Sequence, residues 1–262
     1  MRYQINYNNS NLFYYKFGIG QKHILLFHGF GQDHTTFDSW IEVLKNDYTI
    51  YAFDLFFHGE SVWNENHPLE KDDWKKILSI FFEKENINEF EVGGFSLGGK
   101  FALATLEAFP NQTKKIILAA PDGIKVNFWY GLATYPVLMR GIFETVVSKP
   151  QLFFSLAKFL QSIRVIDNYL LRFVVLQMDT EQKRKQVYAV WILFRPLKFD
   201  MKEIAQLINE RKIGLKIMIG KFDRVIPVKE MNRLLKYVPE GKLKIIDAGH
   251  NNLIEKINLL ED

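Results

Sequence analysis

The sequence predicts an α/β protein with a mostly parallel, eight-stranded sheet and helices on both of its faces. Three observations lead to this prediction. Short apolar runs alternate with helical patterns along most of the 262 residues, as expected where crossover helices join parallel strands. The strand-like runs are mostly apolar, which is typical of strands covered on both faces. Hydrophobic residues make up 48% of the chain and charged residues 24%, which excludes wholesale disorder.

The chain opens with a predicted hairpin. Two alternating segments, residues 3–7 and 12–17, flank Asn8-Asn9-Ser10-Asn11, a tetrad rich in turn-forming residues. Six further strand-like runs lie at residues 23–27, 48–53, 90–92, 116–119, 215–219 and 243–246. Helical patterns accompany them at residues 36–44, 74–82, 97–109, 228–237 and 251–260.

One interval interrupts this alternation. Residues 122–200 show helical periodicity, many aromatic residues and few strand signals. We interpret this segment as a helical cap inserted after the sixth strand. Residues 1–121 and 201–262 are then expected to form the α/β core.

The composition excludes several classes of protein. The chain has no cysteine, so it has neither disulfides nor a cysteine nucleophile. A net charge of +4 is too small to indicate nucleic-acid binding. The polar start lacks the apolar core of a signal peptide, and no stretch reaches the roughly 20 apolar residues of a membrane-spanning helix. No metal-binding pattern is present. We therefore expect a cytoplasmic protein without a transmembrane segment, a metal or a cofactor; its oligomeric state stays open.

The segment FEVGGFSLGGKF at residues 90–101 carries the most specific signal. Gly94-Phe95-Ser96-Leu97-Gly98 matches G-x-S-x-G, the nucleophile elbow, in which a strand turns sharply into a helix with serine at the tip. The turn exposes the serine hydroxyl, and the helix N-terminus directs free N–H groups toward a developing oxyanion. A serine that only caps the helix is the structural alternative.

The same segment also fits a phosphate-binding loop. Gly94, Gly99 and Lys100 satisfy G-x-x-x-x-G-K, but the next residue should be serine or threonine to ligate Mg²⁺. Phe101 stands there instead and cannot ligate a metal. The pattern therefore disfavours a nucleotide site, and Lys100 is expected to be an ordinary lysine on the helix surface.

A serine nucleophile requires a base and an orienting acid. His250 follows the run at 243–246, and Asp223 follows the run at 215–219, so both lie at the carboxyl ends of predicted parallel strands. The order Ser96, Asp223, His250 is the order associated with the elbow motif. Asp122, which follows the run at 116–119, is the rival for the role of the acid. Near the start, Phe30 lies in a glycine-flexed loop that can turn a backbone N–H toward an oxyanion.

The chain resembles the cap-bearing branch of the α/β-hydrolase family. The resemblance rests on HGFG at 28–31, DLFFHGES at 54–61, GFSLGG at 94–99, GKFDRVIP at 220–227 and AGH at 248–250. The second motif departs from the family's usual D-x-x-G-H-G-x-S, because phenylalanines occupy positions 56 and 57. We expect His28 to organise its loop, and His58 and Asp54 to hydrogen-bond within their own turn.

The resemblance implies a catalytic triad of Ser96, Asp223 and His250, with the N–H groups of Phe30 and Leu97 as the oxyanion hole. It implies a serine hydrolase, which we expect to be a carboxylesterase acting on a small or medium apolar ester. Serine at the elbow excludes the dehalogenase and epoxide hydrolase branches, which carry aspartate there.

Alternative functions stay open. The same triad could serve C–C bond hydrolysis or a lyase step like that of menaquinone synthesis, with a substrate carboxylate received by one of the cap arginines, Arg140, Arg164, Arg172 or Arg195. A non-catalytic ligand receptor on the same scaffold and a phosphate-loop nucleotide binder are the remaining alternatives.

Overall fold

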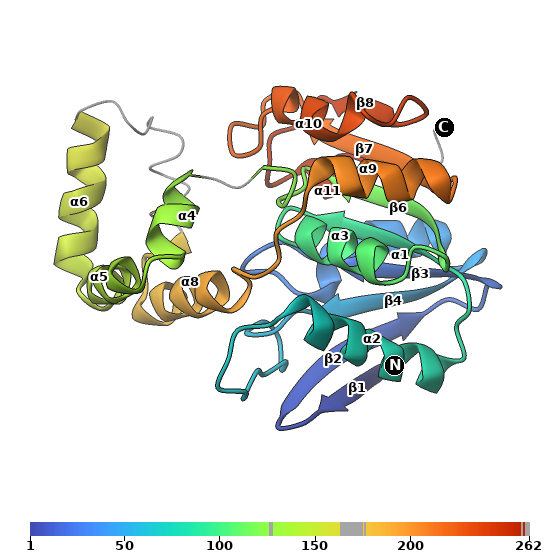
Figure 1. Cartoon of the computed structure of the whole chain (residues 1–262), viewed down its shortest axis with the longest axis horizontal. Helices are drawn as coiled ribbons and strands as arrows, with labels where there is room; N and C mark the ends of the chain where they lie inside the picture. Colours follow the sequence, from blue (N-terminus) through green and yellow to red (C-terminus); the bar gives the residue numbers. More distant parts are fainter. Residues whose placement is uncertain (126–127, 163–174, 176, 258, 260–262) are drawn as a thin grey trace. The chain divides into compact units, whose positions relative to one another are not determined.

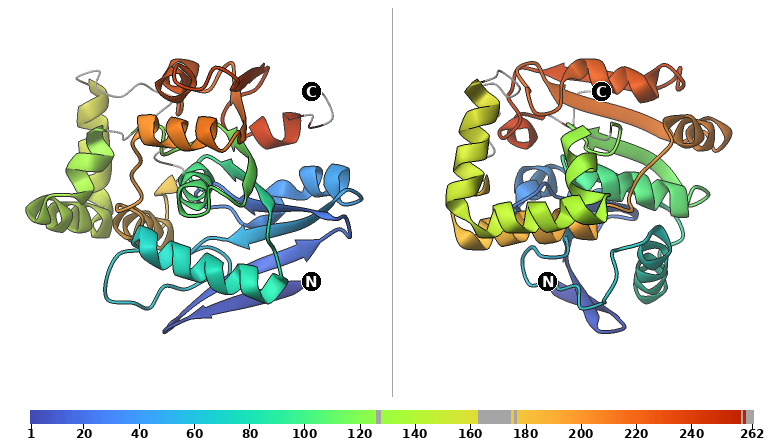
Figure 2. Two further views of the ribbon diagram at one scale, coloured as in Figure 1. Left: turned by 45° about the vertical axis from the view of Figure 1, so that its right-hand side comes forward. Right: turned by 60° about the vertical axis from the view of Figure 1, so that its left-hand side comes forward.

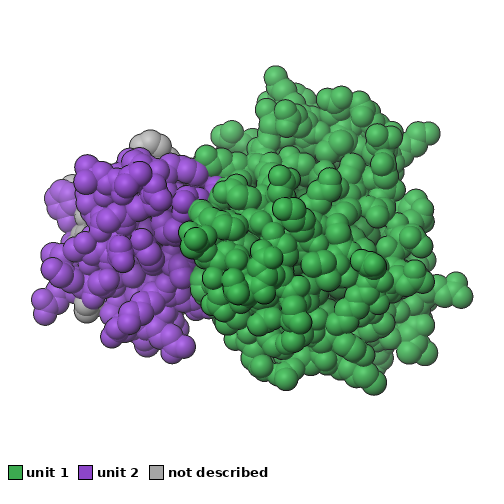
Figure 3. Space-filling model, turned by 60° about the horizontal axis from the view of Figure 1, so that its bottom comes forward, with its two compact units in different colours: residues 1–125, 196–262 green, residues 126–195 purple. Residues whose placement is uncertain are grey.

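The computed structural model describes residues 1–125, 128–162, 175, 177–257 and 259. The chain divides into two compact units, which Figure 3 colours separately: unit 1 comprises residues 1–125 and 196–262, and unit 2 comprises residues 126–195. The interpretation of the inserted segment as a cap stays a prediction.

Unit 1 contains one eight-stranded sheet in the order β1-β2-β4-β3-β5-β6-β7-β8 (Figure 1). The antiparallel pairs are β1 with β2 and β2 with β4, and all the other neighbours are parallel. The strands are β1 (Arg2–Tyr7), β2 (Ser10–Phe17), β3 (Lys22–Phe27), β4 (Tyr48–Asp54), β5 (Phe90–Phe95), β6 (Thr113–Ala119), β7 (Gly214–Gly220) and β8 (Lys242–Ile246). The predicted mostly parallel, eight-stranded sheet is confirmed.

Helices cover both faces of this sheet (Figures 1 and 2). They are η1 (His34–Phe37), α1 (Asp38–Leu44), α2 (Lys71–Glu85), α3 (Gly98–Ala108), α9 (Met201–Glu210), η2 (Val228–Met231), α10 (Asn232–Leu235) and α11 (Leu253–Lys256). The helix predicted at 228–237 is divided into η2 and α10. The one predicted at 251–260 is only four residues long in the described part of the chain.

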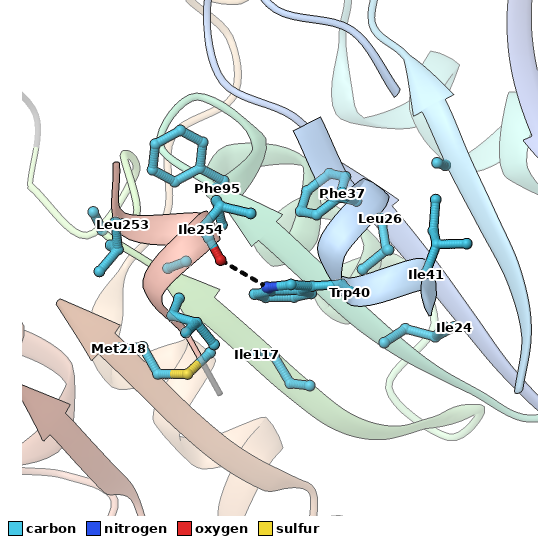
Figure 4. Packing of buried hydrophobic residues seen from close by; sticks show 14 of the residues in the cluster. Ile24, Leu26, Phe37, Trp40, Ile41, Phe95, Ile117, Met218, Leu253 and Ile254 are labelled. Carbon is cyan, nitrogen blue, oxygen red and sulfur yellow. Dashed lines mark hydrogen bonds between the residues drawn. The ribbon is translucent and has the colours of Figure 1, made fainter. Parts of the chain in front are cut away.

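Successive residues of β3 show how one strand packs on both faces. Leu26 belongs to the cluster around Trp40 of α1, which Figure 4 shows together with Ile254 of α11. The Trp40 indole N–H donates to the Ile254 carbonyl at 3.3 Å. Phe27 points to the other face, where its ring centroid lies 5.5 Å from that of Trp74 on α2. Both faces are thus buried, as a mostly apolar strand requires.

Unit 2 is helical in the part that the structure describes. It contains α4 (Phe128–Thr134), α5 (Val137–Ser148), α6 (Pro150–Ser162) and α8 (Glu181–Leu193). Aromatic rings join α4, α5 and α8: Trp191 of α8 lies 5.2 Å from Tyr130 and 5.3 Å from Phe143, measured between centroids. Arg184 is buried and donates from Nε to the Val147 carbonyl at 2.9 Å. Among the described residues of the chain, no helix has both the length and the apolar character needed to cross a membrane.

Candidate active site

Ser96 stands on the sharp turn between β5 and α3. Its φ of +50° lies in the left-handed region, which a non-glycine residue adopts only when its surroundings impose it. The end of β6 holds this turn on both sides: the Ser96 N–H donates to the Ala119 carbonyl at 3.0 Å, and the Asp122 N–H donates to the Ser96 carbonyl at 2.8 Å. The side chain remains partly exposed.

Glycine is required around Ser96 because the backbones approach closely. A Cβ on Gly94 would lie 2.3 Å from the Gly98 carbonyl oxygen, and a Cβ on Gly98 would lie 1.8 Å from the Phe27 carbonyl oxygen. Side chains at these positions would therefore overlap backbone atoms. The glycines of G-x-S-x-G allow α3 to begin directly against the end of β3.

His250 lies within hydrogen-bonding reach of Ser96. Its Nε2 is 3.0 Å from the Ser96 Oγ, and its Nδ1 is 2.6 Å from Oδ2 of Asp223. The ring is almost fully buried and lies 5.3 Å from the Phe95 ring, measured between centroids. Because a carboxylate accepts, Nδ1 is the donor, and in the neutral ring Nε2 then directs its lone pair to the serine hydroxyl.

Asp223 is held by both of its carboxylate oxygens. While Oδ2 faces His250, Oδ1 accepts from the N–H groups of Val225 and Ile226 at 2.9 and 2.8 Å. The side chain is fully buried. Two backbone donors fix the plane of the carboxylate and satisfy the oxygen that the imidazole does not use.

Asp122, the rival acid, has other partners. Its Oδ2 lies 3.1 Å from Lys100 Nζ, and its Oδ1 accepts from the Gly123 N–H at 2.7 Å. Lys100 is only 6% exposed, so the expectation of an ordinary surface lysine was wrong. The lysine lies on the buried side of α3, because the segment after β6 passes over this part of the helix.

The two N–H groups expected to form an oxyanion hole have no protein acceptor among the described residues. Phe30 lies in the loop after β3, and Leu97 directly precedes α3. This loop and the elbow are close neighbours: a Cβ on Gly29 would lie 3.1 Å from the Phe95 ring. Neither N–H group is therefore used by another protein group in the described part of the chain.

The loop after β3 is tied to the loop after β4. The Leu55 N–H donates to His28 Nε2, and the Gly31 N–H donates to His58 Nε2, each at 3.0 Å. His28 therefore organises more than its own loop. His58 does contact its own turn, at 3.0 Å from its Nδ1 to the Phe56 carbonyl, but its link to Gly31 was not predicted.

Asp54 forms hydrogen bonds both within and outside its own turn. Its Oδ1 accepts from the backbone N–H of His34 at 2.8 Å, so the carboxylate binds outside its own turn. Its backbone carbonyl accepts from Ser61 Oγ at 2.6 Å, within its own turn, as expected. The sequence offers no signal for the contact of His58 with Gly31 or for that of Asp54 with His34, because both contacts depend on how β3 and β4 pair.

The four arginines of the inserted segment are only partly described. Arg164 and Arg172 lie outside the described residues. Arg195 donates from Nη1 to the Ile192 carbonyl at 2.8 Å. Arg140 has a buried Nε without a hydrogen-bond partner in the described part of the chain. Among the described residues, no group of three or more His, Asp or Glu side chains is arranged to hold a metal ion.

Comparison with known proteins identifies the family of the fold. The sequence profile of a family described as "alpha/beta hydrolase fold" matches residues 22–257. Lipase 1 of Psychrobacter immobilis is 24% identical over 248 residues, which cover 91% of this chain and 74% of the lipase. The poly(3-hydroxyalkanoate) depolymerase of Ectopseudomonas oleovorans is 25% identical over 246 residues, which cover 89% of this chain and 79% of the depolymerase.

A solved structure has the same fold. The thermophilic esterase from Thermogutta terrifontis, determined with malate bound, superposes with a TM-score of 0.70 at 20% sequence identity. The alignment covers 97% of this chain and 93% of the esterase. At this level of identity the similarity concerns the fold alone.

Proposed function

The chain belongs to the α/β-hydrolase family, and on that premise we propose that it is a serine hydrolase that cleaves carboxylic esters through an acyl-enzyme on Ser96. The observation that carries the proposal is the distance of 3.0 Å between His250 Nε2 and Ser96 Oγ. A base this close, itself oriented by a buried carboxylate, is what turns a weak hydroxyl nucleophile into a reactive one.

The proposed reaction has two steps. Ser96 Oγ attacks the ester carbonyl carbon while His250 Nε2 takes the hydroxyl proton. The oxyanion is stabilised by the N–H groups of Phe30 and Leu97. His250 then protonates the leaving alkoxide, the C–O bond breaks, and the acyl group stays on Ser96. Water, deprotonated by His250, attacks the acyl-enzyme, and the carboxylic acid leaves as Ser96 recovers its proton.

Asp223 has an electrostatic and orienting role in this scheme. The imidazolium that forms in each step lies 2.6 Å from a carboxylate that two backbone N–H groups hold in place. The carboxylate stabilises the positive ring and keeps the neutral ring in the tautomer whose Nε2 can accept a proton.

We propose an ester with a small or medium apolar acyl group as the substrate, and unit 2 as a cap that selects it. The relatives named lipase and poly(3-hydroxyalkanoate) depolymerase, and the esterase of similar fold, favour ester cleavage. The chain leaves the sheet at the carboxyl end of β6 to form unit 2, and ligands of open α/β sheets bind at this edge. The aromatic rings of unit 2 favour an apolar ligand.

Ser96→Ala tests the reaction. We expect turnover of p-nitrophenyl esters to fall by about 10⁴-fold or more, since the members of a triad act as a unit. A fluorophosphonate probe should label the wild type at Ser96 and leave the variant unlabelled. Ser79→Ala, which alters an exposed serine on α2, is the matched control and should keep both properties. A folded wild type that neither hydrolyses any ester of a graded acyl series nor reacts with the probe would overturn the proposal.

One observation favours a second candidate, cleavage of a C–C bond in a substrate that carries a carboxylate. A buried guanidinium nitrogen without a partner, as in Arg140, is suited to receive an anion. Under this alternative, activity on a diketo acid should exceed activity on simple esters and should be lost in Arg140→Met. Retention of ester turnover in the same variant would favour the esterase.

A further inference from the structure

Two buried histidines link the loop after β3 to the loop after β4 in a reciprocal way. His28 lies in the first loop and accepts a backbone N–H from the second, and His58 lies in the second and accepts a backbone N–H from the first. Their ring centroids are 5.0 Å apart. Both side chains are almost fully buried, at 0% and 3% exposure, so water does not replace these bonds.

The partners determine the protonation of each ring. A backbone N–H can only donate, so the Nε2 atom that it approaches carries no proton. A carbonyl can only accept, and the Nδ1 atoms lie 2.6 Å from the Gly29 oxygen for His28 and 3.0 Å from the Phe56 oxygen for His58. Both rings are therefore neutral and carry their hydrogen on Nδ1. Burial, the largest cause, favours this form by lowering the pKa of His28 to about 3 and that of His58 to about 4.

The peptides held by these rings are the two that flank Phe30. The Gly29 carbonyl, which accepts from His28 Nδ1–H, belongs to the same peptide plane as the Phe30 N–H. Because a trans peptide is planar with its C=O and N–H opposed, holding the oxygen fixes the direction of the N–H. His58 holds the next peptide by the N–H of Gly31, whose φ of +72° places it in the left-handed region.

We propose that His28 and His58 are positioning residues that hold the Phe30 N–H in place as an oxyanion-hole donor. This inference rests on the proposed esterase function. His28 Nδ1–H binds the carbonyl of the donor peptide, which also polarises that peptide's N–H toward a ligand. His58 keeps the loop from rotating about the bonds of Phe30 and Gly31.

Charged neighbours do not alter this assignment. His28 is influenced by Asp33 and His34 of its own loop as well as by His58, and His58 is influenced by Asp33. Asp33 favours the protonated ring in each case, but burial outweighs it. His58 disfavours the protonation of His28, and burial favours the neutral form of both rings.

A comparison of two His58 variants tests the proposal. His58→Leu removes the acceptor for Gly31, and we expect kcat to fall by about 10- to 100-fold while KM changes by less than about threefold, because the donor acts on the oxyanion rather than on the bound ester. His58→Gln offers a side-chain oxygen to the same N–H and should recover most of kcat. His67→Gln alters an exposed histidine and serves as the matched control, with kcat and KM unchanged. Circular dichroism of each variant checks that it is folded.

A transition-state analogue provides the decisive kinetic measurement. A trifluoromethyl ketone forms an oxyanion on the serine, so its inhibition constant should rise in proportion to the loss of kcat/KM in His58→Leu. If His58→Leu weakens the binding of substrate and of analogue equally, or if it changes KM alone, the positioning role is overturned.

Nuclear magnetic resonance separates this inference from the proposed function. In protein labelled with ¹⁵N-histidine, both rings should show the Nδ1–H tautomer between pH 7 and 5, and the Gly31 amide should show a coupling to the His58 ring. A ring with its hydrogen on Nε2 overturns the inference even if the enzyme is active. If the wild type hydrolyses no ester and Ser96 is not labelled, the proposed function fails, and the positioning role in catalysis fails with it.

Discussion

Lys100 and Asp122 form an ion pair beside the elbow, with 3.1 Å between Nζ and Oδ2. The lysine side chain is 8% exposed and the aspartate side chain 37%, so the lysine is buried while the aspartate is partly open to solvent. The backbone N–H of the same aspartate donates to the Ser96 carbonyl. The lysine of the apparent G-x-x-x-x-G-K pattern thus has a structural partner, and the carboxylate that competes for the role of triad acid is turned to Lys100.

Replacing each aspartate by asparagine distinguishes the two carboxylates. Asp223→Asn should lower kcat by about 10³- to 10⁴-fold, because the amide no longer enforces the tautomer of His250 or stabilises the imidazolium. Asp122→Asn should change kcat by less than about threefold, because its carboxylate contacts Lys100 instead. The measurement is kcat on one p-nitrophenyl ester. A larger loss in Asp122→Asn than in Asp223→Asn would assign the acid to the earlier strand.

The backbone of Ser96 makes a prediction about stability. Serine and alanine are both strained at a φ of +50°, whereas glycine is not. Ser96→Gly should therefore unfold at a higher urea concentration than Ser96→Ala, with a free energy of unfolding greater by about 1 kcal/mol. Both variants lack the hydroxyl, so the comparison isolates the backbone. An alanine variant as stable as the glycine variant would show that the turn is not strained.

The parts of the site that the sequence could predict are those encoded by local patterns. Each triad candidate follows a predicted strand and stands close to a glycine, a pattern that is recognisable within a few residues for Ser96, Asp223 and His250. The chain order then suggests which side chains meet. The parallel sheet is predicted in the same way, because buried strands separated by helices have few alternative arrangements. β5 extends beyond the predicted residues 90–92 to Phe95. A Cβ on Gly93 would lie 2.7 Å from the Leu26 side chain, so glycine suits this position of the strand.

The contacts that the sequence could not predict depend on the paths of segments distant in the chain. Nothing around Lys100 shows that the segment after β6 covers that side of α3. The link from His58 to Gly31 requires the two loops to be adjacent, which follows only from the pairing of β3 with β4. The helices predicted at 228–237 and 251–260 end earlier than their periodicity suggests, at Leu235 and Lys256.

Two glycines with opposite surroundings test the steric account of the elbow. Gly98→Ala places a Cβ 1.8 Å from the Phe27 carbonyl oxygen, so α3 must move or the protein must unfold. We expect a loss of more than about 3 kcal/mol of stability, or no folded protein. Gly141→Ala is the matched control, because a Cβ there meets nothing within 4 Å and α5 should gain about 0.5–1 kcal/mol. Thermal unfolding of both variants measures the contrast. Similar melting temperatures would contradict it.

The buried histidines make stability depend on pH. Burial lowers the pKa of His58 to about 4, below its ordinary value near 6.5. As the pH falls below 6.5, the unfolded chain binds a proton at this residue while the folded chain does not, so the free energy of unfolding decreases until the pH approaches 4. Above 6.5 the ring is neutral in both states and contributes no pH dependence.

The wild type and His58→Gln should therefore converge in stability at acid pH. Their difference in the free energy of unfolding should shrink by about 2 kcal/mol between pH 7 and pH 4.5, because the variant has no proton to bind at this position. Urea titrations at both pH values measure it. The difference between the wild type and Gly141→Ala, which removes no titratable group, should stay constant. If the gap between the wild type and His58→Gln also stays constant, the ring is protonated in the folded state at pH 4.5, and its hydrogen bond to Gly31 is not the one described here.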